Sequence, residues 1–372
     1  MDISSSPYGW KLNTLITMKL AIKLYTMVAV IVLFLGMFMI NTVTAKADST
    51  STSSGLSFTV KTNLPDNQID KNNDFYQLKM QPGQKQTITA TIYNITQKET
   101  KVAINVQSAS TTINGSLDYS KAPNSWDNSL KYKLSDMIRY PKLVTVDAGK
   151  SQDVSFEITM PNDLFNGILL GGITFNQADS DGVELSRGAS IQNRYAYAVA
   201  MVLKESDSQV KPNINLQRVT PGQNNGHNVL NVSFQNDQPL LMSNVQVNAK
   251  IYSEMGKKPV YSSMKSDMQI APNSQFKYPV SLQGTPMQPG KYRIEATVTG
   301  TAYKTPKTWH FSRKFTIERQ EAHALNQSDV DLAANTNNQT ILFIAFAMIA
   351  LLIILFMILL ILKRKKSHTM NK

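Results

Sequence analysis

The sequence lacks cysteine altogether and contains only four histidines and three tryptophans among its 372 residues. The absence of cysteine excludes disulfides, thiolate zinc sites, iron–sulfur clusters and cysteine nucleophiles. Charged residues make up 17% of the chain and hydrophobic residues 42%, which is too apolar for a disordered protein. At about 150 residues per domain, this length predicts two domains.

Positive charge is concentrated at the two ends of the chain. The net charge is +12, yet residues 48–340 hold 29 basic and 25 acidic residues, a net charge of only +4. Residues 363–372 contain five basic residues and no acidic one. Because the central region offers no continuous basic stripe for phosphates, we predict no nucleic-acid partner.

The first 47 residues have the features of a secretory signal peptide. Two lysines precede the apolar run 27–40, and Ala45-Lys46-Ala47 supplies the small-x-small pattern that signal peptidases cleave. Cleavage is predicted after Ala47, and Met18 is a plausible true start because residues 1–17 add little to the signal. An uncleaved N-terminal anchor is the alternative.

The other end predicts a transmembrane helix over residues 341–362. These 22 residues contain no charge and no proline, and at about 1.5 Å per residue they are long enough to cross the hydrocarbon core. Four basic residues follow at 363–366, so the positive-inside rule places the tail 363–372 in the cytoplasm. The helix should be retained, because residues 321–340 contain no Leu-Pro-x-Thr-Gly sorting motif. The prediction is a single-pass protein of the cell membrane with residues 48–340 outside.

Alternation of apolar and polar residues dominates the region between the two ends. Ile88, Ala90 and Ile92 alternate with threonines, and Val154, Phe156 and Ile158 alternate with polar residues. This period of two is typical of half-buried antiparallel strands, and Pro-Gly or Ala-Gly turns precede several of them. We therefore predict an all-β fold of two tandem immunoglobulin-like β-sandwiches.

Composition sets the expected domain bounds. The first sandwich is predicted over 56–177 and the second over 194–318, and the polar stretch 178–193 is the linker between them. The run 195–203 is apolar on both faces, which predicts a central strand of the second sandwich. Residues 319–340 are polar and predict a stalk that would span about 25 Å as a flexible coil, although residues 322–333 show a weak helical pattern.

Catalytic and metal-binding signals are sparse. His227, His310 and His323 have no second histidine or carboxylate at metal-ligand spacing, and no nucleophile elbow or phosphate-binding loop occurs. We predict neither an enzyme nor a bound cofactor or metal, although a triad assembled from distant residues stays open. The acidic stretch with Asp66, Asp70 and Asp74 offers oxygen ligands for calcium, or it is a solvated turn.

The segment 117–142 combines aromatic side chains with polar ones. Aromatic faces beside hydrogen-bonding groups bind sugar rings or protein surfaces, so these residues are candidates for glycan or partner binding. The alternative is that they fasten a long inter-strand excursion to the sandwich. The candidates are Tyr119, Trp126, Tyr132 and Tyr140.

Three glycines near one predicted strand have a simpler explanation. A strand that contains Gly167, Gly171 and Gly172 allows a bulge or the close approach of a neighbour. We do not assign them to a ligand site.

In their order along the chain, these features resemble the WxL-interacting cell-surface proteins of Gram-positive bacteria. Part of the chain resembles that family's peptidoglycan-binding domain and part resembles its host-binding domain. The first resemblance is carried by residues 56–62, 75–84, 93–96 and 161–175, and the second by 194–205, 230–237 and 287–298.

The resemblance implies a non-enzymatic adaptor anchored in the membrane. Its expected partners are peptidoglycan, WxL-domain surface proteins and a host extracellular-matrix protein, with the bilayer held through the C-terminal helix. Two alternatives stay open. One is a wall-glycan hydrolase or transferase. The other is an accessory subunit of a sensor or transport complex, whose helix would pack through Ala345, Ala347 and Ala350.

Overall fold

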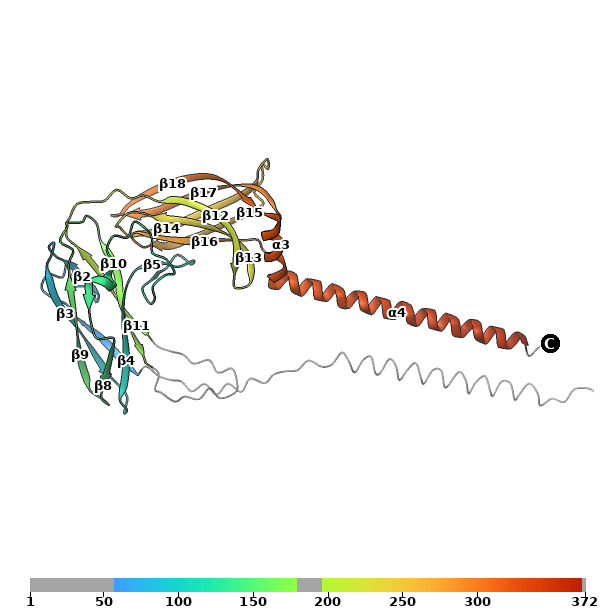
Figure 1. Cartoon of the computed structure of the whole chain (residues 1–372), viewed down its shortest axis with the longest axis horizontal. Helices are drawn as coiled ribbons and strands as arrows, with labels where there is room; N and C mark the ends of the chain where they lie inside the picture. Colours follow the sequence, from blue (N-terminus) through green and yellow to red (C-terminus); the bar gives the residue numbers. More distant parts are fainter. Residues whose placement is uncertain (1–56, 179–195, 370–372) are drawn as a thin grey trace, which may run out of the picture. The chain divides into compact units, whose positions relative to one another are not determined.

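The computed structural model describes residues 57–178 and 196–369 (Figure 1). The predicted signal peptide, the proposed start at Met18 and nearly all of the predicted linker lie outside the described residues. The fold class predicted from the alternation is confirmed, because the described chain is mostly β and forms two sandwiches followed by one apolar helix.

The first sandwich is built from a four-stranded and a five-stranded sheet. The four-stranded sheet has the order β1 (Phe58–Asn63), β3 (Lys85–Asn94), β9 (Ser151–Thr159) and β7 (Ile138–Arg139). The five-stranded sheet has the order β2 (Tyr76–Lys79), β11 (Ala196–Lys204), β10 (Leu169–Gln177), β4 (Thr100–Ser108) and β8 (Leu143–Val146). Alternate residues of both sheets meet in one apolar core.

The second sandwich pairs a three-stranded with a four-stranded sheet. The first has the order β12 (Asn215–Asn224), β13 (His227–Asn236) and β16 (Ser274–Ser281). The second has the order β15 (Tyr261–Ile270), β14 (Met242–Ser253), β17 (Gly290–Ala302) and β18 (Thr305–Ile317). Alternate residues of β14 enter its core, where Val245, Val247, Ala249 and Ile251 are fully buried.

The expected central strand at 195–203 belongs to the first sandwich and not to the second. The structure places β11 between β10 and β2, antiparallel to β10 and parallel to β2. Met201 and Leu203 are fully buried in the first core. The apolar pattern correctly indicated a central strand, but a pattern within one strand does not show which sheet the strand enters.

A buried asparagine closes a loop in each sandwich. In the first, the side-chain amide of Asn94 donates hydrogen bonds to the carbonyls of Lys98, Val146 and Asp147 at 2.7–3.0 Å. In the second, fully buried Asn236 donates to the carbonyls of Leu240 and Ala271 at 2.8 and 2.9 Å. Both lie at the end of a long strand, where side-chain hydrogen bonds satisfy backbone groups that leave the ladder.

The glycine prediction is confirmed by close approaches. A Cβ on Gly172 would lie 2.6 Å from the ring of Tyr119, and one on Gly171 would lie 2.1 Å from the carbonyl oxygen of Gln107. Gly167 has a φ of +85°, and its neighbour Ile168 donates a hydrogen bond to the Pro239 carbonyl at 2.7 Å. Strand β10 is thus buried on both faces because other segments pack directly onto its backbone.

The excursion between β4 and β7, residues 109–137, connects the two sandwiches. It contains β5 (Ser110–Thr111), β6 (Leu117–Asp118) and α2 (Leu134–Met137). The hydroxyl of Thr111 accepts a hydrogen bond from the Ala271 amide at 3.0 Å, and the amide of Gln235 donates to both oxygens of Asp127 at 3.0 Å. Gly115 accepts from the Gln269 amide at 2.7 Å. All these groups belong to one compact unit.

The predicted flexible stalk is helical. Helix α3 (Arg319–Ser328) packs on the second sandwich through buried Ala322, and Asn326 exchanges hydrogen bonds with the backbone of Met287 at 2.8 and 3.0 Å. Helix α4 (Val330–Thr369) then continues through the apolar segment. The weak helical pattern at 322–333 was the correct signal, and tertiary contact supplies the stability that the polar composition did not indicate.

Candidate functional site

A hollow of the first sandwich lies where its two sheets meet near β7. This hollow, the Tyr140 groove, has a volume of about 940 Å³. Strands β3 and β9 line it from one sheet, β4 lines it from the other, and α2 and β7 close one side. Its lining residues are Lys85, Gln86, Thr87, Ile104, Asn105, Gln107, Ser135, Asp136, Met137, Ile138, Arg139, Tyr140, Lys142, Glu157, Ile158 and Thr159.

The Tyr140 groove has a buried apolar floor and a polar rim. Ile138 and Ile158 are at least 95% buried beneath it. The rim carries exposed cationic side chains at Lys85, Arg139 and Lys142 and exposed carboxylates, together with amide and hydroxyl groups. A mixed rim of donors and acceptors can bind polymers that carry hydroxyl, acetamido and carboxylate groups.

Tyr140 belongs to this groove, but its aromatic ring also serves the core. The ring stacks on Phe156 with centroids 6.1 Å apart, and the hydroxyl accepts a hydrogen bond from the Val106 amide at 3.1 Å. Tyr132 packs against Phe165 with centroids 6.1 Å apart, under the ammonium group of Lys131 at 4.8 Å from its ring centroid.

The other two candidate aromatics lie elsewhere in the excursion. Tyr119 is half-buried against a small cluster with Leu170 and Ala271, and burial raises the pKa of its hydroxyl. Trp126 is half-buried. Tyr119 and Tyr140 thus pack against different apolar clusters, so the four residues do not form a single aromatic platform.

Sequence reasoning missed the polar residues of the Tyr140 groove. Thr87, Asn105, Gln107 and Glu157 are the outward-facing members of alternating strands, so the pattern identifies them as exposed. It does not indicate that three strands from two sheets bring them to the same hollow, because that depends on strand order.

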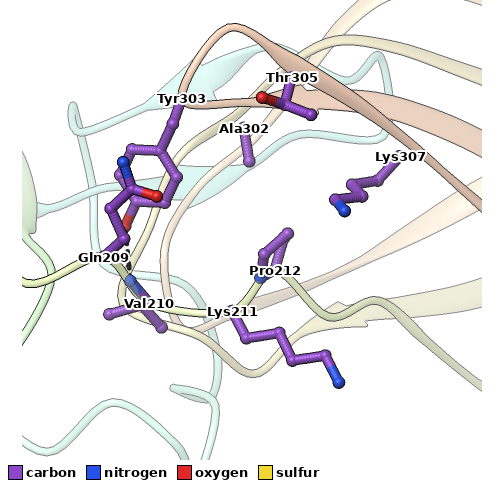
Figure 2. A pocket seen from close by; sticks show the side chains of 8 residues that line it. All are labelled: Gln209, Val210, Lys211, Pro212, Ala302, Tyr303, Thr305 and Lys307. Atoms are coloured by element: carbon purple, nitrogen blue, oxygen red, sulfur yellow. Dashed lines mark hydrogen bonds between the residues drawn. The ribbon is translucent and has the colours of Figure 1, made fainter.

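A smaller hollow of about 330 Å³ lies between the β17–β18 hairpin and the segment that enters the second sandwich (Figure 2). The hydroxyl of Tyr303 accepts a hydrogen bond from the Val210 amide at 2.9 Å, which Figure 2 shows as a dashed line. Tyr303 and Lys304 form the two-residue turn with φ values of 49° and 66°, a conformation that usually selects asparagine or glycine. This hydrogen bond fastens the entering segment to the hairpin.

Three metal-ligating side chains meet where α4 begins. One ligand atom each from His227, Asp329 and Asp331 lies within 4.8 Å of the others, and His227 Nδ1 is 3.0 Å from Asp331 Oδ2. Asp329, however, caps the helix by accepting hydrogen bonds from the backbone amides of Asp331 and Leu332 at 3.0 and 3.2 Å, while Asn228 donates to its other oxygen at 2.7 Å. The arrangement is that of a helix N-cap.

The Asp329 carboxyl titrates as expected for such a cap. Burial acts to raise the pKa of Asp329, but hydrogen bonds from backbone amides outweigh it and hold the pKa below its usual range. The other acidic candidate, the stretch around Asp70, forms a turn in which Asp70 Oδ1 accepts from the Asn72 amide at 3.0 Å. That geometry fits the solvated-turn alternative.

The β14–β15 hairpin of the second sandwich carries exposed apolar side chains. Met255, Val260 and Met264 are 92%, 48% and 65% exposed. Strand β15 is also an edge strand, because it ends the order β15-β14-β17-β18. We call Met255, Val260 and Met264 the methionine hairpin. Exposed apolar groups beside an edge strand are typical of protein-binding surfaces.

Two family profiles match the chain in tandem. Residues 58–177 match the peptidoglycan-binding domain of WxL-interacting proteins, and residues 186–327 match their host-binding domain. The chain belongs to the WxL-interacting protein family. All lining residues of the Tyr140 groove fall within the peptidoglycan-binding match, and the methionine hairpin falls within the host-binding match of this WxL-interacting protein.

Several solved structures are similar to this WxL-interacting protein at low sequence identity. A chain of the chaperone–tip adhesin complex of CFA/I fimbriae is 11% identical with a TM-score of 0.28, covering 70% of this chain and 98% of its own. The Escherichia coli chaperone DraB is 13% identical with a TM-score of 0.25, covering 65% and 94%. A chain of the Acinetobacter baumannii CsuC–CsuE complex is 9% identical with a TM-score of 0.27, covering 60% and 90%. No curated protein matches the chain.

One helix of the described chain is long and apolar enough to cross a membrane. It covers Phe343–Leu362, and its side chains are exposed throughout. Together with the two domain matches, this indicates a single-pass surface-binding protein.

Proposed function

We propose that this protein is a non-enzymatic adaptor that holds peptidoglycan with its first sandwich and captures a WxL-domain or host matrix protein with its second. The observation that carries the proposal is the tandem match to a peptidoglycan-binding and a host-binding domain, followed by the apolar helix. The same proposal includes domain bounds near 56–177 and 194–318, corrected so that β11 belongs to the first sandwich. It also includes the cytoplasmic position of the tail 363–372 and an N-terminal signal peptide.

The Tyr140 groove is the proposed wall-binding surface. Its cationic rim suits the carboxylates of peptide stems, and its amide and hydroxyl groups suit the hydroxyl and acetamido groups of the glycan. Tyr140 contributes a ring held in place by Phe156 rather than a freely exposed platform. The other three aromatic candidates, Tyr119, Trp126 and Tyr132, are proposed to hold the excursion in place.

Neutralising two cations of the rim should weaken wall binding. We expect the double variant Arg139→Gln, Lys142→Gln to bind isolated peptidoglycan at least about tenfold more weakly, because two charge-assisted hydrogen bonds are lost. Both side chains are exposed, so the fold should be retained. Sedimentation with insoluble peptidoglycan measures the effect.

Lys150→Gln is the matched control, because Lys150 is an exposed lysine in the turn before β9 and outside the groove. It should bind like the unaltered protein. Equal binding by the double variant and the control would show that the Tyr140 groove is not the wall-binding surface.

The methionine hairpin is the proposed partner-binding surface. Methionine adapts its shape to varied apolar partners, and an edge strand can pair with a strand of the partner. Strand β15 is an edge strand whose Gln269 amide is bonded to Gly115, and the exposed Met255 and Met264 lie on the same hairpin.

Negative charges on this hairpin should weaken partner capture strongly. We expect Met255→Asp combined with Met264→Asp to weaken binding of WxL-domain proteins about thirtyfold, as for the loss of an interface hot spot, and to leave peptidoglycan binding unchanged. Surface plasmon resonance on immobilised partner measures this. Thr308→Asp, an exposed change on the opposite edge strand β18, is the control. Undiminished capture by the double variant would refute this assignment.

A further inference from the structure

Glu205 carries a buried oxygen without a hydrogen-bond partner, and among the residues that the structure describes it is alone in this. The residue follows β11 and is only 8% exposed. Its Oε2 accepts a hydrogen bond from the Phe165 amide at 2.9 Å, and Oε1 is the unpartnered atom. Burial raises the pKa of this carboxyl, against the opposing effect of the Phe165 amide. A buried carboxylate oxygen without a donor is unfavourable unless another group supplies one.

Glu205 lines a hollow of about 860 Å³, which we call the Glu205 pocket. The pocket lies where β2 and β11 end, and the loops after β1 and β2 form its walls. Ile69 and Met80 give these walls an apolar part, and Gln81 and Gln84 give them amide groups. The pocket therefore combines an unmatched acceptor with an apolar surface and amides, as a site for a short polar chain requires.

The cations nearest the pocket are already engaged by another carboxylate. Lys204 Nζ lies 2.7 Å from Asp207 Oδ1, and Lys79 forms a second ion pair with Asp207 Oδ2. These two lysines hold the pKa of Asp207 at about 2, so Asp207 stays ionised and keeps both of them. Neither lysine pairs with Glu205, so the described residues of the chain supply no donor to Oε1.

We propose that the Glu205 pocket binds a primary ammonium group carried on a peptide, with Oε1 of Glu205 as its acceptor. An ammonium group supplies both the missing donor and the missing opposite charge, and its aliphatic stem matches Ile69 and Met80. This inference rests on the proposed wall-binding function, because uncrosslinked peptide stems are the part of peptidoglycan that carries free amines. It also gives β11 a binding role within the first sandwich.

The test compares binding of the full-length protein, in detergent micelles, to native peptidoglycan and to peptidoglycan whose amines have been acetylated. We expect the unaltered protein to prefer the native polymer about tenfold, the contribution of one charge-assisted hydrogen bond. Glu205→Gln should bind both polymers at the level of the acetylated one. Glu99→Gln, an exposed change in the β3–β4 turn, should keep the preference.

A soluble probe makes the test independent of the variants. Nα-acetyl-lysine amide should compete with native peptidoglycan for the unaltered protein, and the Nε-acetylated form of the same probe should not. Equal binding to both polymers, competition by both probes, or a preference retained by Glu205→Gln would overturn the inference, and a bound water would then satisfy Oε1. If the unaltered protein bound neither polymer, this would instead refute the proposed wall-binding function.

Discussion

A fragment that ends at residue 177 is expected not to fold, although the match to the peptidoglycan-binding domain ends there. The fragment would lack β11, which pairs with β10 along Leu169–Asn176 and with the whole of β2. It would also lose Met201 and Leu203 from the core and leave two strand edges unpaired. We expect a far-ultraviolet circular dichroism spectrum without a cooperative thermal transition.

A longer fragment, 56–208, is the matched control. It restores β11 and the hydrogen bond from the Phe165 amide to Glu205, so it should unfold cooperatively. A cooperative transition for the fragment that ends at 177 would show that β11 is dispensable for the first sandwich. Both fragments should carry the same tag, so that a difference between their thermal transitions is not caused by the tag.

The second large effect is a loss of stability when Gly171, which lies in β10, is replaced by alanine. A methyl group there would lie 2.1 Å from the carbonyl oxygen of Gln107 and 2.5 Å from Leu134 Cδ1. The Gln107 oxygen belongs to the backbone of paired strand β4, so the strands themselves would have to shift. We expect Gly171→Ala to lower the free energy of unfolding by at least about 3 kcal/mol, the upper part of the range for overpacked cores.

Chemical denaturation of the full-length protein in detergent measures this loss, monitored at the transition of the first sandwich. Gly149→Ala is the control, because Gly149 has a φ of +62° and no atom within 4 Å of an added Cβ. Gly149→Ala should lower the free energy of unfolding by only about 1 kcal/mol, because it adds backbone strain without a steric clash. Similar losses for the two variants would contradict the close-packing explanation of Gly171.

The sequence was sufficient to predict the strands that contain residues 88–92 and 154–158, because each depends on its own alternating residues. Val154, Phe156 and Ile158 are inward-facing in β9 as expected, and the close approaches at Gly171 and Gly172 were anticipated from glycine in a strand. The resemblance to WxL-interacting proteins is likewise confirmed by the two domain matches.

What depends on strand order could not be predicted. The sheet that β11 joins, the gathering of the Tyr140 groove and the burial of Glu205 all follow from pairings between segments distant in sequence. Asp329 is similarly brought to the Asn228 amide from 101 residues away. Local patterns determine which residues face inward, whereas tertiary contacts determine which of them meet.

The packing of α3 against the second sandwich limits the distance between that sandwich and the apolar segment. With α3 docked, only residues 330–340 separate the sandwich from the apolar segment, and as a helix they span about 17 Å. If mechanical tension on a captured partner pulled α3 away and unfolded it, residues 319–340 would extend to about 70 Å. The contacts of Ala322 and Asn326 would have to break before this extension, so their strength would determine the force at which the second sandwich moves away from the membrane.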